Sequence, residues 1–225
     1  PNLVAQQPNS GKDYIVLMHG LWNSSDRMED FEDYFRDKGY QVLNIDYPST
    51  EHPIAELDLK FVKPIIEAVP VKEGQKIHFV THSLGGIVLR HYLTHHELHQ
   101  IGKVVMLSPP NHGSEWADLL MTRPAAQGIA GPAAMELRTK DNEFFKNLGP
   151  VDFELGIIAG NQSYTNTTEE YLPGIDDGMV SLDSMRLDGM TDFIVLNEHH
   201  RGLTESEIAM KQTESFIMNG YFQHN

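Results

Sequence analysis

The segment Val80–Gly86 (VTHSLGG) places a serine where a catalytic nucleophile would be expected. An apolar run precedes Ser83 and a helical pattern follows it at once, which is the order of a nucleophile elbow, a tight turn that lifts the hydroxyl above a sheet. Gly85 supplies the small residue needed where strand and helix pass closely, whereas Thr81 stands where G-x-S-x-G has its first glycine. The structural alternative is a serine that only caps the helix. We predict that Ser83 is a nucleophile.

The loop His19–Trp22 (HGLW) directly follows an earlier apolar run. Acyl transfer from a serine requires two backbone N–H groups aimed at the developing oxyanion. We expect one from Leu84, the residue after the serine, and one from this loop, where Gly20 permits close approach. The Leu21 amide is the first candidate and the Trp22 amide the second. A plain strand-to-helix turn is the alternative for this loop.

Two adjacent carboxylates, Asp176 and Asp177, lie in the loop 172–180 (LPGIDDGMV). A catalytic triad needs one carboxylate that orients the histidine and stabilises the imidazolium. Because neighbouring side chains point apart, only one of the two can do so. A cation site or a turn cap is the alternative for the pair.

Two adjacent histidines, His199 and His200, follow the last apolar run of the chain. The order serine, acid, histidine along the chain is that of serine hydrolases with a nucleophile elbow. Only one of the two can be the general base, and the residues alone leave both open.

The loops that carry these residues must be positioned by the elements between them. Short apolar runs, typical of strands buried on both faces, alternate with helical spacing. The expected strands are Tyr14–Met18, Gln41–Asp46, Lys76–Thr81, Lys103–Leu107, Phe153–Ala159 and Asp192–Leu196, and the expected helices are Asp26–Lys38, Pro53–Val69, Leu84–Leu98 and Thr204–Met218. This alternation predicts an α/β fold with a mainly parallel sheet of about six strands and helices on both faces. Ligands of such sheets bind at the carboxyl ends of the strands, where all four loops begin.

Length and composition indicate a single domain that spans residues 1–225. Residues 1–12 are expected to form a loose lead-in, and residues 108–150, rich in Pro, Gly and Ala, a partial cover over the site. The net charge of −15 disfavours nucleic acid and anionic bilayers as partners. The sequence has no cysteine, which excludes disulfides, thiolate metal ligands and cysteine catalysis. No apolar run approaches the ~20 residues of a transmembrane helix.

Other histidines are expected to be structural. His91, His95 and His99 recur every four residues, a spacing that can bind zinc, but the nearby glutamate is misplaced for H-E-x-x-H. We therefore predict a solvated helix face there and no metal site in the protein. His78 lies in an expected strand and is predicted to be satisfied in the core.

Taken together, the motifs resemble bacterial single-domain α/β-hydrolases of the lipase/esterase type, and in turn the wider lipase and PGAP1-like group. The resemblance covers roughly Tyr14–Phe222 and rests on HGLW, VTHSLGG, SPPNHGSE, GPVDFELGIIAG, DDGMVS and the terminal histidine loop. It implies the α/β-hydrolase fold and, through the D-G-x-V form common in lipases, favours Asp177 over Asp176. It also favours His200 as the base, with His199 as the alternative. Because members often carry a signal peptide, it slightly favours a periplasmic or secreted protein over a cytoplasmic one.

The expected activity is hydrolysis of a small-molecule or lipid carboxylic ester through an acyl-enzyme on Ser83, without a cofactor. An acyltransferase of the same fold and a catalytically silent binding module are the alternatives. The sequence predicts no oligomeric state. The residues expected to line the substrate pocket are His19, Gly20, Trp22, His82, Pro109 and His112.

Overall fold

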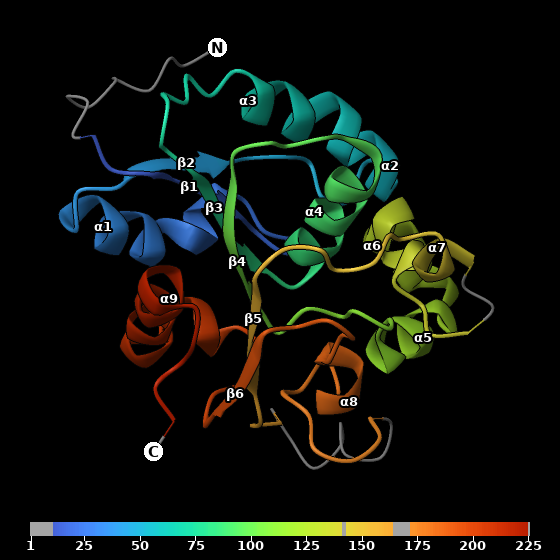
Figure 1. Ribbon diagram of the computed structural model, residues 1–225. Coiled ribbons are helices and arrows are strands. Elements are labelled where there is room, and N and C mark those ends of the chain that lie inside the picture. The colour runs from blue at the N-terminus through green and yellow to red at the C-terminus, as the bar shows by residue number, and fades with distance from the viewer. Residues whose placement is uncertain (1–10, 141–142, 164–171, 225) are drawn as a thin grey trace.

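The computed structural model describes residues 11–140, 143–163 and 172–224. Its centre is a six-stranded sheet of order β2-β1-β3-β4-β5-β6 (Figure 1). The strands are β1 (Tyr14–Met18), β2 (Gln41–Ile45), β3 (Ile77–His82), β4 (Ile101–Leu107), β5 (Leu155–Gly160) and β6 (Asp192–Leu196). Every pairing among these strands is parallel. The expected α/β fold with a parallel sheet is therefore confirmed.

The inner strands are rich in apolar residues because both of their faces are covered. All residues of β1, β3 and β5 are buried, whereas most residues of the edge strands β2 and β6 keep some exposure. Alternate side chains of one strand therefore enter two separate cores. Val16 and Met18 face one core, and Ile15 and Leu17 face the other.

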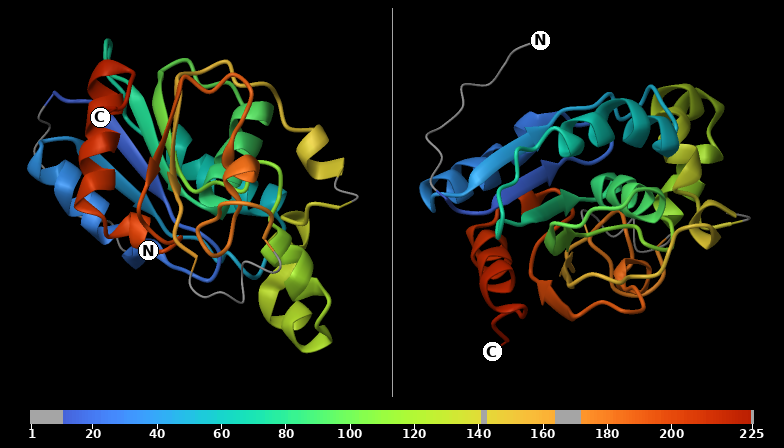
Figure 2. Two further views of the ribbon diagram at one scale, coloured as in Figure 1. Left: turned by 90° about the horizontal axis from the view of Figure 1, so that it is seen from below. Right: turned by 45° about the horizontal axis from the view of Figure 1, so that its top comes forward.

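Helices cover both faces of the sheet. One face carries α1 (Glu29–Asp37) and α9 (Glu207–Asn219), which lie near each other on the same side in Figures 1 and 2. The other face carries α2 (Ile54–Leu57), α3 (Lys63–Glu67) and α4 (Leu84–His95). The remaining elements are α5 (Glu115–Met121), α6 (Pro124–Glu136), α7 (Glu143–Lys146), α8 (Leu182–Met185), η1 (Ser25–Met28), η2 (Asp58–Val62) and η3 (Gly202–Thr204).

The helix expected over Pro53–Val69 is divided into three parts. Between α2 and α3 the chain forms η2, a π-helical turn, and Pro64 stands at the start of α3. A proline has no N–H to donate to the preceding turn, so the regular α-helical ladder cannot pass through that position. The last helix begins at Glu207, not at Thr204, because the Ser206 side chain accepts a hydrogen bond from the Ala209 amide and caps it.

The segment 108–150 contains three helices, and α5 and α6 lie together at one end of the molecule (Figure 2). The path of α6 is kinked at Gly131, whose φ is 79°. A Cβ there would lie 1.9 Å from the Thr50 carbonyl oxygen, so glycine lets α6 pack directly on the loop after β2.

Of the expected lead-in 1–12, only Gly11 and Lys12 lie within the described residues, and both are exposed. None of the helices described here is long and apolar enough to cross a membrane.

The packing of α9 on the sheet gives a stability prediction. Phe216 is fully buried, and its ring packs against Phe222 with centroids 5.0 Å apart. Phe216→Ala should lower the free energy of unfolding by about 3–5 kcal/mol, because it leaves a cavity against the sheet. Ile208→Ala is the matched control on the same helix, since Ile208 is 59% exposed; it should change the value by less than about 0.5 kcal/mol. Urea unfolding followed by circular dichroism measures both, and equal effects would contradict this packing.

Candidate active site

Ser83 stands at the junction between β3 and α4 in a strained backbone conformation. Its φ is 52° and its ψ is −122°, a region that side-chain-bearing residues rarely occupy. The turn is fixed on both sides: the Ser83 N–H donates to the Leu107 carbonyl at 2.9 Å, and its carbonyl accepts from the Gly86 N–H at 3.0 Å. Strain of this kind is that of a sharp strand-to-helix turn that exposes one hydroxyl.

The glycines after Ser83 make this turn sterically feasible. A Cβ at Gly85 would lie 2.6 Å from the Met18 carbonyl oxygen, so the start of α4 can pass β1 only without a side chain. Thr81 is fully buried where the usual motif has glycine. A Cβ at Gly86 would lie 3.2 Å from Thr81 Oγ1. The second glycine of the helix therefore provides the space that the bulkier threonine requires.

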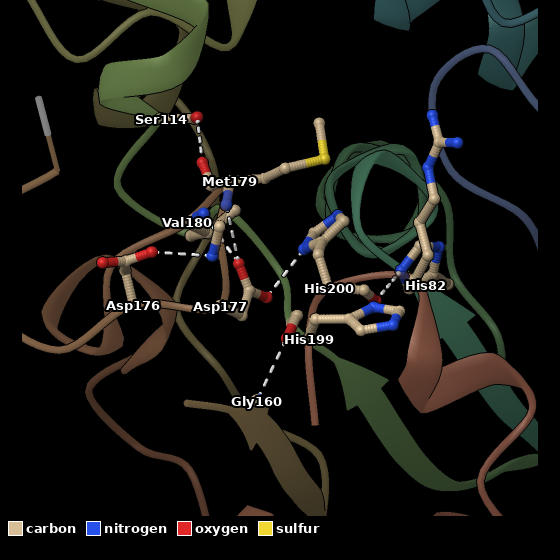
Figure 3. A network of polar contacts seen from close by, with 12 residues as sticks. His82, Ser114, Gly160, Asp176, Asp177, Met179, Val180, His199 and His200 are labelled. Carbon is tan, nitrogen blue, oxygen red and sulfur yellow. Dashed lines mark hydrogen bonds and ion pairs between the residues drawn. The ribbon is translucent and has the colours of Figure 1, made fainter. Parts of the chain in front are cut away.

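Asp177 and His200 form a buried hydrogen-bonded pair (Figure 3). His200 Nδ1 donates to Asp177 Oδ2 at 2.7 Å. The other oxygen, Oδ1, accepts from the Met179 amide at 3.0 Å and the Val180 amide at 2.9 Å. Asp177 is fully buried and His200 is 2% exposed, so the carboxylate is held rigidly away from water. With its Nδ1 proton bound to the carboxylate, the ring keeps Nε2 as the basic nitrogen.

The neighbouring acid and histidine serve other contacts. Asp176 Oδ1 accepts hydrogen bonds from the Gly178 amide at 2.7 Å and from the Ser163 hydroxyl. Asp176 therefore bonds to residues near it in the chain. His199 is exposed, and its Nδ1 accepts from the Gly202 amide at 2.9 Å. Of the two pairs left open by the sequence, the structure thus brings Asp177 and His200 together.

Ser83 and His200 line one small pocket together with Leu21. The rest of its lining comes from Pro110, Ser114, Trp116, Ala117, Ala134, Leu137, Met179 and Val180. Its volume is about 20 Å³, close to the space that one water molecule occupies. The pocket is largely apolar, and side chains of α5 and the end of α6 form part of its wall. Residues of the segment 108–150 therefore line this pocket.

Two backbone amides beside Ser83 remain without an acceptor. Within the described part of the chain, neither the Leu21 N–H nor the Leu84 N–H donates a hydrogen bond to another residue. A Cβ at Gly20 would lie 3.1 Å from the Ser83 Cβ, so glycine brings this loop against the serine. Trp22, with a φ of 56°, turns away and its Nε1 donates to the Ile129 carbonyl of α6 at 3.1 Å. This hydrogen bond links the loop His19–Trp22 to α6.

Comparison with known proteins identifies the family. The family model described as "Alpha/beta hydrolase family" matches residues 15–193. The chain belongs to the alpha/beta hydrolase family. No curated protein matches the sequence.

Solved structures with the same fold include lipases and an esterase. The mature lipase BlEst2 from Bacillus licheniformis superposes with a TM-score of 0.73 at 22% identity, over 96% of this chain and 95% of that one. The Staphylococcus hyicus lipase gives 0.69 at 11% identity, over 96% and 97%. The metagenomic carboxyl esterase MGS0156 gives 0.64 at 17% identity, over 90% and 68%. At these identities the likeness establishes the fold.

Two histidines expected in the substrate pocket of this alpha/beta hydrolase are instead buried and are not among the residues that line it. His19 is fully buried and stacks on Tyr47 with centroids 4.1 Å apart. His82 is 1% exposed, and its Nε2 donates to the His200 carbonyl at 3.0 Å. Burial lowers the pKa of His19 and lowers that of His82 well below its usual value. Both rings are therefore neutral supports of the loops that carry the site.

The other expected pocket residues lie around the pocket rather than in its lining. Pro109 is buried near Gly86, and the residue that faces the pocket is Pro110. His112 is exposed, and its amide donates to the Ser184 carbonyl at 3.1 Å. In a turn, successive side chains point in different directions, so the sequence located the correct loops but not the inward-facing residue of each. Side chains of α5 and α6 that line the pocket carried no sequence signal, because no chemical group marks them.

His91 of α4 is buried, which corrects the prediction of a solvated face for that histidine. Its Nδ1 lies 2.7 Å from Oδ2 of the fully buried Asp58 on η2, and His96 Nε2 lies 3.3 Å from the same oxygen. His95 and His99 match the expected exposure, and 82% of the His99 side chain is accessible. The approach of η2 to α4, distant in sequence, accounts for the difference. His78 is satisfied as expected, by Asp13 at 3.1 Å and by the Lys103 amide at 2.9 Å.

The buried histidines predict how stability depends on pH. Because the pKa of His82 is lowered in the fold from 6.5, the unfolded chain binds protons below about pH 6.5 that the folded chain does not. The contribution of neutral His82 to the free energy of unfolding should therefore be complete above that pH. It should fall as the pH decreases towards the lowered pKa. His82→Asn should flatten this slope by up to about 1.4 kcal/mol per pH unit. Urea unfolding between about pH 5 and about pH 7 measures it.

His99→Asn is the control for that experiment, because the His99 side chain is 82% accessible and is not packed in the core. His99→Asn should leave the slope as it is in the wild-type protein. A slope in His82→Asn as steep as that of His99→Asn would contradict a buried, neutral His82.

Proposed function

We propose that this alpha/beta hydrolase is a serine esterase or lipase that cleaves carboxylic esters through an acyl-enzyme on Ser83. The observation that carries the proposal is the meeting of strained Ser83 and Asp177-bound His200 at one apolar pocket. Two structural neighbours, a lipase and a carboxyl esterase, favour the same reaction class.

In the first half of the proposed reaction, the Ser83 hydroxyl attacks the ester carbonyl carbon. His200 Nε2 takes the hydroxyl proton, and Asp177 stabilises the imidazolium that forms. The carbonyl oxygen becomes an oxyanion, which the free amides of Leu21 and Leu84 are positioned to bind. Preorganised donors at a water-poor pocket stabilise that charge more strongly than water would.

In the second half, the tetrahedral intermediate collapses and the C–O bond to the alcohol breaks. The imidazolium of His200 returns its proton to the leaving alcohol, and the acyl group stays on Ser83. Water then attacks the acyl-enzyme with the same proton transfers in reverse. No step requires a cofactor. The apolar lining suits a hydrophobic acyl group.

Removal of the serine hydroxyl tests the nucleophile. Ser83→Ala should lower the hydrolysis of p-nitrophenyl esters by about 10³-fold or more, the usual loss when a triad member is removed. A fluorophosphonate probe should label the wild-type protein and leave Ser83→Ala unlabelled, whereas a binding module would not react. Turnover by Ser83→Ala close to that of the wild-type protein would refute the proposal.

Product analysis with an added alcohol separates hydrolysis from acyl transfer. Hydrolysis releases the free acid, whereas acyl transfer gives an ester of the added alcohol.

The adjacent histidines form a matched pair of variants for the general base. His200→Ala should lower kcat by about 10³-fold or more, because the proton of Ser83 loses its acceptor. His199→Ala should keep most of the activity, since this ring is exposed and is not among the residues that line the pocket at Ser83. Steady-state kinetics on one ester measures both. Similar, mild losses in the two variants would place the base elsewhere.

A further inference from the structure

Arg90 of α4 is a buried cation without a carboxylate partner. It is 7% exposed, and no ion pair joins it to any acid in the described part of the chain. Other arginines differ: Arg27 lies 2.7 Å from Glu205, and Arg36 lies 2.5 Å from Glu32. Burying a charge without a counter-charge is costly, so an unpaired one calls for an explanation.

The guanidinium is only partly satisfied by the protein. Its Nη1 donates to the backbone and side-chain oxygens of Asn111 at 3.1 Å and 3.3 Å. Asn111 is itself fixed, because its Nδ2 donates to the Met185 carbonyl at 2.7 Å. The Nε atom is buried without a partner, and Nη2 donates to no group among the described residues. A guanidinium has five N–H donors, so most of this one remains unused.

A cavity of about 160 Å³ opens beside Arg90, between α4 and the segment Gly149–Phe153. A cavity of comparable size, about 150 Å³, accommodates a molecule such as benzene. Leu93 and Thr94 complete the wall formed by α4. None of these residues lines the pocket at Ser83, so the two cavities are distinct.

The facing segment adds further donors. The amides of Val151, Asp152 and Phe153 donate no hydrogen bond within the part of the chain that the structure describes. The segment is anchored to α4, because the Gly149 amide donates to Thr94 Oγ1 at 2.8 Å. Burial lowers the pKa of Arg90 to about 10, which leaves it charged at neutral pH. One wall thus holds a fixed cation, and the other holds free N–H groups.

We propose that this cavity binds a small oxyanion, a carboxylate or phosphate group, on the Arg90 guanidinium. A planar guanidinium matches the oxygens of both groups, and its interaction with an anion is strengthened by the low exposure of the site. The ligand supplies the missing counter-charge and accepts from the unused N–H groups. The site is independent of the reaction proposed at Ser83.

Two-dimensional ¹H–¹⁵N NMR of the whole protein tests the site without any activity assay. Inorganic phosphate, and separately acetate, is added at constant ionic strength with chloride as the balancing anion. The Arg90 Nε–H signal and the amides of Gly149, Val151, Asp152 and Phe153 should shift saturably, with a dissociation constant of about 1 mM or lower. Arg90→Gln should abolish the response of these amides. A shift with phosphate alone assigns a phosphate ligand, and one with acetate alone assigns a carboxylate.

A second variant keeps Arg90 in place, so the test does not depend on the folding of Arg90→Gln. Asp152 is exposed beside the cavity, and its negative charge opposes an anion. Asp152→Asn should tighten binding by about 1.4- to 5-fold, the range expected when one exposed charge is removed. Asp37→Asn makes the same charge change on α1, across the sheet, and should leave the affinity unchanged. The proposal is overturned if neither anion shifts these signals, or if chloride alone produces the same shifts.

Discussion

The hydrogen bond from His200 to the buried carboxylate of Asp177 is the interaction on which the site depends. It joins two loops that leave the sheet after β5 and β6, and a backbone bond from the His200 amide to the Asp177 carbonyl at 2.8 Å reinforces it. The contact requires close packing below the loops. A Cβ at Gly160, the last residue of β5, would lie 3.0 Å from the Asp177 Cβ. The absence of a side chain at Gly160 therefore leaves room for Asp177.

His82, the residue before Ser83, extends this connection to the third loop. His82 is directly bonded along the chain to Ser83, and its ring holds the His200 carbonyl and packs against the His200 ring with centroids 4.8 Å apart. Because burial lowers the pKa of His82 well below its usual value, this ring supports His200 as a neutral group. The three loops at the carboxyl ends of β3, β5 and β6 are thus held to one another by short polar contacts.

The cover over the pocket is built differently, from apolar contacts and a few polar links. Trp22 bonds to the α6 backbone and its ring meets the edge of Trp116 on α5, with centroids 5.1 Å apart. The Ser114 hydroxyl donates to the Met179 carbonyl at 2.7 Å, which links the start of α5 to the acid loop. These contacts account for the small volume at Ser83, since they hold both the loop His19–Trp22 and the loop 172–180 against α5 and α6.

The sequence by itself determined the strands, the order of the loops and the residue types at their tips, because buried parallel strands and strand-to-helix turns impose local patterns on composition. Tyr14–Met18 and Asp192–Leu196 were located to the residue for this reason. Only the tertiary structure decided between Asp176 and Asp177 as the partner of a histidine, and between His199 and His200, because adjacent residues share every local signal and differ only in direction. The same holds for His91 and Arg90 on α4. Their spacing indicates a helix, but their partners, Asp58 and Asn111, lie in segments distant in the chain.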